Sequence, residues 1–182
     1  MKVDLSRYDN SWYQHGPLGK RLAWTIVSIA FFESKWPWPT FLKIGLLSFF
    51  GAHIGKGVVI KPEVKIKYPW RLNVQDHVWI GEKVWIDNLE QVTIESHVCI
   101  SQGAMLLTGN HNYSQSTFDL MVGAIHLKQG SWIGAWSIVC PNVTCGEHSI
   151  LSVQSVATKD LLPWGIYQGN PAQFKKTRAI VS

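Results

Sequence analysis

The segment IGKGVVIKPEVKI, residues 54–66, carries an isoleucine at every sixth position. The same spacing recurs in VQDHVWIGEKVWI (74–86) and IESHVCISQGAML (94–106), and it resumes from residue 127 to residue 157. An α-helix has a period of about 3.6 residues and a strand a period of about two, so neither produces a strict six. A solenoid of hexapeptide repeats produces a six-residue period, because each short strand points one aliphatic side chain inward and the turn that follows points a small side chain inward. The pattern therefore predicts an all-β solenoid.

Interruptions of the repeat indicate the shape of each coil. The spacing slips by two residues after Ile66 and after Ile86, and by fifteen after Leu106. Each slip follows a third hexapeptide. This is expected if each coil has three sides and the extra residues are all inserted at the same corner. Fifteen hexapeptides then form about five coils, roughly 24 Å tall at about 4.8 Å between strands. A β-sandwich, the alternative, would show a period of two and irregular turn spacing.

Three parts are expected along the chain: an apolar helical segment (1–53), the solenoid (54–162) with an inserted loop (107–126), and a C-terminal tail (163–182). Apolar residues make up 46% of the 182 residues and charged ones 16%, so the chain can bury a sizeable core. Seventeen Lys and Arg against twelve Asp and Glu give a net charge of +5. That charge suits an anionic ligand or a membrane surface but selects neither.

Several function classes find no support in the sequence. The three cysteines have neither a disulfide pattern nor zinc-ligand spacing, which favours a reducing, cytoplasmic location. The first ten residues lack the apolar run of a secretory signal. Neither a GxxxxGK[ST] loop nor a dinucleotide fingerprint is present, and no His, Cys and carboxylate cluster occurs. Nucleotide hydrolysis, hydride transfer, a catalytic metal and a nucleic-acid partner are therefore not expected.

Five short blocks carry a resemblance to a known family. They are TGNH (108–111), GSWIG (130–134), PNVT (141–144), TKD (158–160) and GNPA (169–172). In this order they resemble the hexapeptide-repeat acyltransferases, specifically the acetyl-CoA-dependent O-acetyltransferases of the galactoside, maltose and xenobiotic types. The apolar N-terminus before GAHIG (51–55) looks closest to the colanic-acid-biosynthesis type. The resemblance implies a left-handed parallel β-helix, a homotrimer, acetyl-CoA as donor, and a saccharide or lipid-linked saccharide as acceptor.

One of the seven histidines stands out as a candidate base. His77, His97 and His148 occupy outward turn positions of ordinary hexapeptides, whereas His111 lies in the inserted loop. A long loop on a rigid solenoid is commonly functional. The match of residues 109–111 to the family's catalytic loop implies that His111 is the general base of a direct transfer without covalent intermediate. Relatives often carry Asp where this chain has Asn112, so what orients the imidazole is open; a backbone carbonyl is one candidate.

The resemblance also implies residues that hold the coenzyme A carrier between neighbouring subunits. Gly134 and Ala135 match the turn whose backbone N–H meets the thioester carbonyl, although a glycine there also suits a tight turn. Val153, Thr158 and Lys159 match positions that contact pantetheine and pyrophosphate. In the tail that completes this site, Lys176 stands where relatives often place an arginine for the 3′-phosphate and adenine.

Two residues are candidates on the acceptor side. Trp132 matches a residue that walls the reaction centre, or it is one more packed aromatic. Asn88 faces the same edge as the inserted loop, and it suits either a hydrogen bond to the acceptor sugar or a turn. Trp79, Trp85 and Trp132 each precede an inward aliphatic residue, so they line the outer surface, where aromatic rings suit sugar faces and subunit interfaces equally.

Residues 18–50 predict two apolar helices separated by Pro37 and Pro39. One interpretation is that they cap the open end of the solenoid. The other is peripheral contact with a membrane, at its inner face, since Arg, Lys and Trp flank both apolar runs. The two interpretations are compatible.

Two alternatives to a sugar O-acetyltransferase stay open at this point. The solenoid is also compatible with a non-catalytic assembly or binding module. It is equally compatible with an acetyltransferase that acts on an amine or another non-sugar acceptor, although relatives of that kind tend to have different N-terminal domains.

Overall fold

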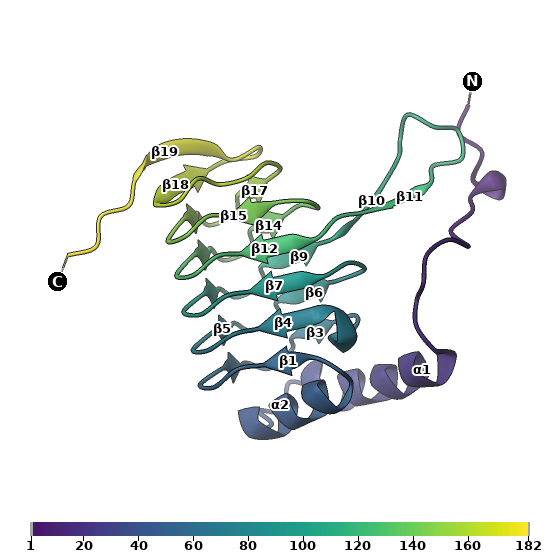
Figure 1. Ribbon diagram of the computed structural model, residues 1–182, viewed down its shortest axis with the longest axis horizontal. Coiled ribbons are helices and arrows are strands. Elements are labelled where there is room, and N and C mark those ends of the chain that lie inside the picture. Colours follow the sequence, from purple (N-terminus) through teal and green to yellow (C-terminus); the bar gives the residue numbers. More distant parts are fainter. Residues whose placement is uncertain (1, 182) are drawn as a thin grey trace.

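In a computed structural model, which describes residues 2–181, the chain winds into a three-walled column of parallel strands (Figure 1). The near wall in Figure 1 runs from right to left as the column climbs, which makes the β-helix left-handed. The predicted fold class is confirmed.

Each wall is one sheet whose strands come from successive coils. Wall A contains β1 (His53–Ile54), β4 (Leu72–Val74), β7 (Val92–Ile94), β12 (Ile125–Leu127) and β15 (Thr144–Cys145). Wall B contains β2 (Val59–Ile60), β5 (Trp79–Ile80), β8 (Cys99–Ile100), β13 (Trp132–Ile133), β16 (Ile150–Leu151) and β18 (Gly165–Gln168), with β19 (Gln173–Thr177) antiparallel at its edge. Wall C contains β3 (Lys65–Ile66), β6 (Trp85–Asp87), β9 (Met105–Leu107), β14 (Ile138–Val139) and β17 (Val156–Ala157).

The column has about six coils rather than the five expected. Leu161 bridges to Cys145 on wall A, and Tyr167 of β18 pairs with Leu151 on wall B. Both steps are sixteen residues, two fewer than a complete coil of three hexapeptides, so the last coil falls out of the six-residue phase. Leu161 and Tyr167 are buried. The solenoid therefore continues into the segment expected to be only a tail.

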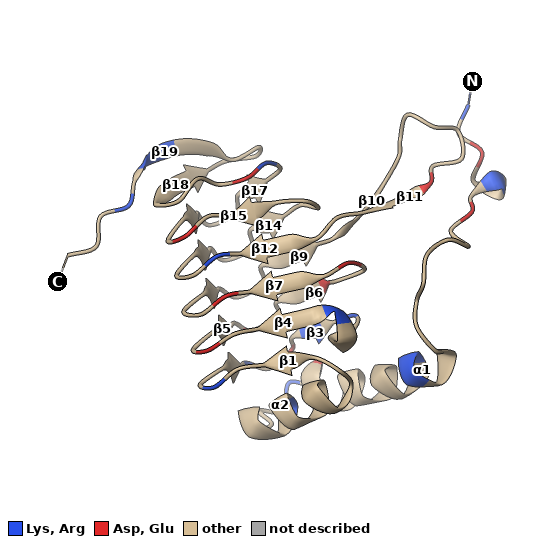
Figure 2. Ribbon diagram, in the orientation of Figure 1, with Lys and Arg blue, Asp and Glu red and all other residues tan. Residues whose placement is uncertain are grey.

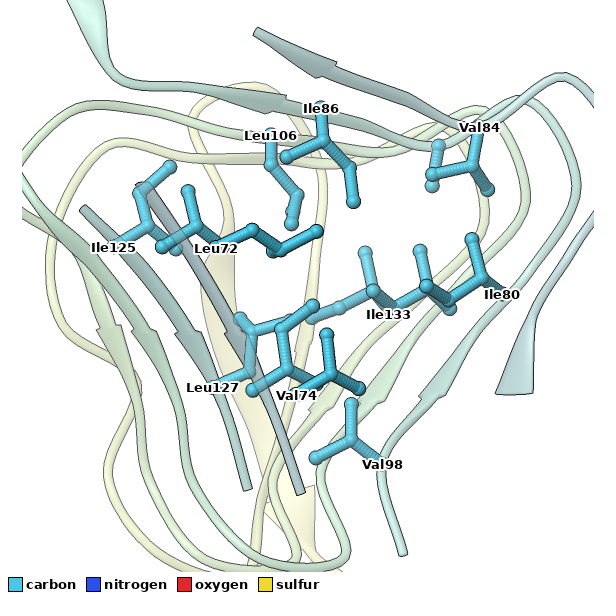
Figure 3. Close-up of a cluster of buried hydrophobic side chains, with 14 of the residues drawn as sticks. Leu72, Val74, Ile80, Val84, Ile86, Val98, Leu106, Ile125, Leu127 and Ile133 are labelled. Carbon is cyan, nitrogen blue, oxygen red and sulfur yellow. The ribbon is translucent and has the colours of Figure 1, made fainter. Parts of the chain in front are cut away.

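The hexapeptide positions form the core. The aliphatic residues of the repeat are buried, except that Ile54 in the first coil is half-buried. Equivalent side chains stack coil upon coil, as the labelled Ile80 and Ile133 show in Figure 3. A fully buried isoleucine contributes roughly 1.5–3 kcal/mol, so the stack supplies the main stabilisation of the column. Corner positions hold small buried residues, such as Ser137 and Ser155.

Two helices close the lower end of the column. Helix α1 (Leu18–Val27) continues into a π-helical turn, η2 (Ser28–Phe32), and α2 (Thr40–Phe49) follows after the two prolines. Phe32 and Leu47 join the core of the first coil, and the indole of Trp24 donates to the carbonyl of Ile66 at 2.8 Å. The predicted helices are confirmed, and their packing caps the column.

Two extensions meet beside the column (Figure 1). The inserted loop is a hairpin made of β10 (Gly109–His111) and β11 (Leu120–Val122), which are paired antiparallel. An arm formed by residues 2–16, with one turn of 3-10 helix, η1 (Leu5–Arg7), runs from α1 up to this hairpin. The amide of Asp4 donates to the carbonyl of Ser116 at 2.8 Å, so the arm is joined to the hairpin tip.

Candidate active site

The backbone of the hairpin fixes the orientation of the His111 ring. His111 Nδ1 lies 2.9 Å from the carbonyl oxygen of Phe118, and the two rings stack with centroids 4.5 Å apart. A carbonyl oxygen only accepts, so a neutral imidazole held here carries its proton on Nδ1. The other nitrogen, Nε2, is then a proton acceptor. The question left open by Asn112 thus has a structural answer, because a backbone carbonyl orients the imidazole.

His111 lines a small pocket of about 190 Å³ between the hairpin, the arm and wall C. The arm supplies Tyr8, whose ring lies 5.8 Å from the imidazole, together with Asn10 and His15. Lys67 and Tyr68 at the first coil line the opposite side. Phenol, amide, imidazole and ammonium groups therefore surround the candidate base.

A buried tyrosine and an arginine clamp the arm against the column. The hydroxyl of Tyr13 donates to the carbonyl of Leu89 at 2.6 Å, and burial raises the pKa of this phenol. Arg71 lies over the Tyr13 ring and donates to the carbonyls of Gln14, at 2.8 Å, and of Leu89. These residues were not predicted, because no local sequence pattern indicates that the N-terminal arm packs beside a hairpin about a hundred residues further along the chain.

A second site is a groove of about 380 Å³ at the corner where wall B turns into wall C. Four of the predicted residues line it together: Trp132, Gly134, Ala135 and Val153. Trp132 is 43% exposed, and its indole N–H donates to the hydroxyl of Ser101 at 2.9 Å, which holds the ring against the groove wall.

Gly134 and Ala135 differ in what their amides can do. The Gly134 amide donates to the carbonyl of Leu151 at 2.7 Å, so it is already used between coils. A Cβ on Gly134 would lie 2.6 Å from the amide nitrogen of Val153, which is why the position requires glycine. Within residues 2–181 the Ala135 amide has no hydrogen-bond acceptor, and it lines the groove. Of the two predicted amides, the one at Ala135 is therefore the one not already used within the described residues.

The remaining predicted carrier residues lie elsewhere. Thr158 and Lys159 are exposed at the corner after β17. The His111 hairpin leaves from the same corner of the column, two strands lower, which is a distance of about 10 Å. Lys176 is exposed on β19 at the top of wall B. One chain thus separates the candidates into a His111 side and a Trp132 side, and the two pockets share no lining residue.

Asn88 has a structural role, so its expected contact with an acceptor is corrected. Its side chain is 0% exposed. The amide nitrogen donates to the carbonyls of Tyr68 (2.6 Å) and Arg71 (3.2 Å), and the oxygen accepts from the amide of Tyr68 at 2.9 Å. With these bonds, Asn88 holds the extended corner of the coil below it. The alternative that the sequence left open, a turn residue, is the one observed.

The three tryptophans that precede an inward aliphatic residue divide between two walls. Trp79 lies two strands below Trp132 on wall B, with Cys99 between them. Trp85 belongs to wall C, where the ammonium of Lys65 lies 5.0 Å from its ring. Trp79 and Trp132 therefore share one outer surface, and Trp85 does not.

Within residues 2–181 we find no group of three or more His, Cys, Asp or Glu residues arranged to hold a metal ion. The helices in this part of the chain are too short or too polar to cross a bilayer.

Comparison with known proteins places this arrangement in context. No family model matches the chain. Over 133 residues, 73% of each protein, the chain is 38% identical to the Escherichia coli (strain K12) protein named as colanic acid biosynthesis acetyltransferase WcaF. It is 25% identical over 125 residues to galactoside O-acetyltransferase of the same organism, which covers 67% of this chain and 62% of that protein.

Solved structures share the fold. A galactoside acetyltransferase in complex with coenzyme A has a TM-score of 0.78 at 21% identity, covering 87% of this chain and 80% of that one. The hexapeptide-repeat acetyltransferase VCA0836 from Vibrio cholerae O1 biovar eltor, complexed with acetyl coenzyme A, has a TM-score of 0.79 at 19% identity and covers 87% of both chains. The resemblance predicted from the five sequence blocks is confirmed: the chain belongs to the hexapeptide-repeat acetyltransferase family.

Proposed function

We propose that the protein transfers an acetyl group from acetyl-CoA to a hydroxyl group of a saccharide, with His111 as the general base. The observation that carries this proposal is the hydrogen bond from His111 Nδ1 to the Phe118 carbonyl, because it leaves Nε2 free to accept a proton. Relatives named for colanic acid biosynthesis and for galactoside acetylation support a saccharide acceptor.

In the proposed reaction the acceptor hydroxyl binds beside His111. Nε2 takes the hydroxyl proton as the oxygen attacks the thioester carbon, and the resulting oxyanion accepts a hydrogen bond from the Ala135 amide. The C–S bond then breaks, and the imidazolium returns its proton to the departing sulfur of coenzyme A. One oxygen–carbon bond forms, one carbon–sulfur bond breaks, and no covalent enzyme intermediate is needed.

The pocket around His111 has the character of a saccharide subsite. Tyr8 offers an aromatic ring, while Asn10, His15 and Lys67 offer hydrogen-bonding groups to hydroxyls. The pocket has a volume of about 190 Å³, so the rest of a larger or lipid-linked glycan would extend beyond it. We assign the acceptor to this pocket.

The carrier is assigned to the groove of Trp132, Gly134, Ala135 and Val153 of an adjacent copy. A single chain keeps this groove apart from His111, so the two sides meet only if a second copy packs against the first. We propose a ring of three copies in which each groove faces the hairpin corner of the next copy. At that corner of one chain, Thr158 and Lys159 lie two strands above the start of the His111 hairpin. Lys159 and Lys176 then supply positive charge for the carrier's phosphates.

The test is a mass-spectrometric screen of sugars, glycolipids and amine acceptors with acetyl-CoA, with the His111→Ala variant as blank. We expect an acetyl ester on a saccharide hydroxyl that the blank does not form. If only amines were acetylated, the acceptor would be an amine and not the proposed saccharide hydroxyl. Saturable binding of coenzyme A without transfer to any acceptor would favour a binding module.

A further inference from the structure

The face of α1 and α2 that points away from the column is apolar. Helices on a protein surface normally bury one side and present polar residues on the other. Here Trp24, Phe32 and Leu47 fill the inner side, yet the outer side exposes large apolar residues as well. Among these, Ile26 is 70%, Phe41 78% and Phe49 83% exposed. We call the outward surface of α1, η2 and α2 the base of the column (Figure 1).

Most of the exposed side chains on the base are apolar. Leu18, Leu22, Ile26 and Ile29 recur at spacings of four, four and three, so they form one stripe along α1 and η2. The hydroxyl of Thr25, within this stripe, donates to the carbonyl of Arg21 in its own helix at 2.9 Å. Its hydrogen bond is therefore already satisfied without water, as required next to hydrocarbon.

Positive charge gathers at the same end of the molecule. Residues 17–71, which form the base and the first coil, contain nine Lys and Arg but two Glu. The other 127 residues contain eight Lys and Arg against ten Asp and Glu. All of the net positive charge of the chain therefore lies around the base, and Figure 2 shows basic residues on α1 and along the first coil. The exposed pair Lys35 and Trp36 between the helices is a combination typical of a bilayer interface.

From these three observations we propose that the base docks on an anionic lipid surface, with α1 and α2 lying in the plane of the interface. Apolar side chains enter the boundary of the acyl chains, while the surrounding lysines and arginines attract the headgroups. A second copy packed base to base would bring the positively charged ends of two columns together, so charge repulsion disfavours that occupant.

Docking in this way would orient the column upright on the membrane. The His111 hairpin leaves the third coil, two strand spacings or roughly 10 Å above the first coil at about 4.8 Å per spacing, and its pocket extends down to the first coil. The lipid contact itself does not depend on the proposed acetyl transfer, and the two are tested by separate measurements.

The test is flotation of the full-length protein with vesicles of phosphatidylcholine alone or mixed with phosphatidylglycerol. We expect binding to the anionic vesicles that weakens as salt is raised, because added ions screen the charge attraction. The double variant Ile26→Glu and Phe49→Glu should lower the bound fraction at least tenfold. Leu162→Glu is the matched control, since Leu162 is 67% exposed at the opposite end of the column; it should bind as the unmodified protein does.

Unchanged thermal melting and coenzyme A binding would show that the variants are folded. Equal binding by the double variant, or equal binding to uncharged and anionic vesicles, would overturn the proposal. A third outcome would also overturn it: the full-length protein binds neither kind of vesicle but forms larger assemblies, and the double variant does not form them. The base would then be an interface between two copies of the chain.

Discussion

His111 is held by a carbonyl that cannot donate, so its tautomer is set without any carboxylate. Replacement by alanine removes the proposed base but not the pocket. We predict that His111→Ala lowers kcat by about 10²- to 10⁴-fold, the range expected for loss of a general base. His97→Ala, which removes an exposed imidazole from an ordinary turn, should change kcat less than about twofold. A steady-state assay tests this prediction. If His111→Ala kept kcat within tenfold of the unmodified protein, His111 would not be the general base.

Ala135 offers a sharper test, because its amide can be deleted without disturbing the turn. Trp136, the next residue, has φ 58°, and in three other turns a proline precedes the positive-φ residue: Pro62, Pro141 and Pro163. Proline therefore fits this turn position. We predict that Ala135→Pro leaves the melting temperature nearly unchanged but lowers kcat by about 10²- to 10³-fold, as for loss of one oxyanion donor.

Glu147→Pro is the control, since Glu147 also precedes a positive-φ residue, His148, but lies outside the groove. It should retain full activity. If Ala135→Pro and Glu147→Pro behaved alike, the Ala135 amide would have no part in the reaction.

Arg71 holds the N-terminal arm in place against the column. Arg71→Met removes the donors to Gln14 and Leu89 and loosens the arm beside the acceptor pocket. We predict a rise in KM for the acceptor of about tenfold, which corresponds to about 1.4 kcal/mol, and an unchanged Kd for coenzyme A. Lys83→Met, an exposed change on the column, should alter neither. Parallel changes in both constants would indicate general damage instead of a looser arm.

Lys43 secures the helical cap. Its side chain is buried, and its ammonium donates to the carbonyls of Lys61 at 2.9 Å and of Ile60 at 3.4 Å. Lys43→Met leaves these carbonyls without a donor. We predict a loss of roughly 1–3 kcal/mol in the free energy of unfolding. The exposed change Lys35→Met should cost less than about 0.5 kcal/mol.

The Lys43 effect should depend on pH with a definite sign. Burial lowers the pKa of Lys43 below its usual value, so the unfolded chain binds this proton more tightly than the folded one. Between the lowered pKa and 10.5 the unmodified protein therefore gains stability as pH rises, and Lys43→Met lacks this gain. The difference between the two unfolding free energies should widen with pH in chemical denaturation. A constant or narrowing difference would contradict the assignment.

At the scale of the whole molecule, the column was predictable because each hexapeptide repeats one packing requirement. The inward positions of Ile60 or Val139 follow from spacing alone, and so does the corner from which the hairpin leaves. The sixth coil was missed because Leu161 and Tyr167 lie two residues out of phase. The groove residues were identified by motif, whereas the arm was not, since contacts between residues 2–16 and a distant hairpin leave no periodic signal.

The central claim is that His111 of one copy acts on a thioester held in the groove of the next. Mixing inactive His111→Ala and Ala135→Pro subunits tests it directly, by co-refolding them in equal amounts and measuring acetyl transfer. In a closed ring of three copies, about one quarter of the interfaces would pair an intact His111 with an intact groove, so activity should return to about a quarter of the unmodified level. Activity no greater than the sum of the two separate variants would contradict a site shared between copies.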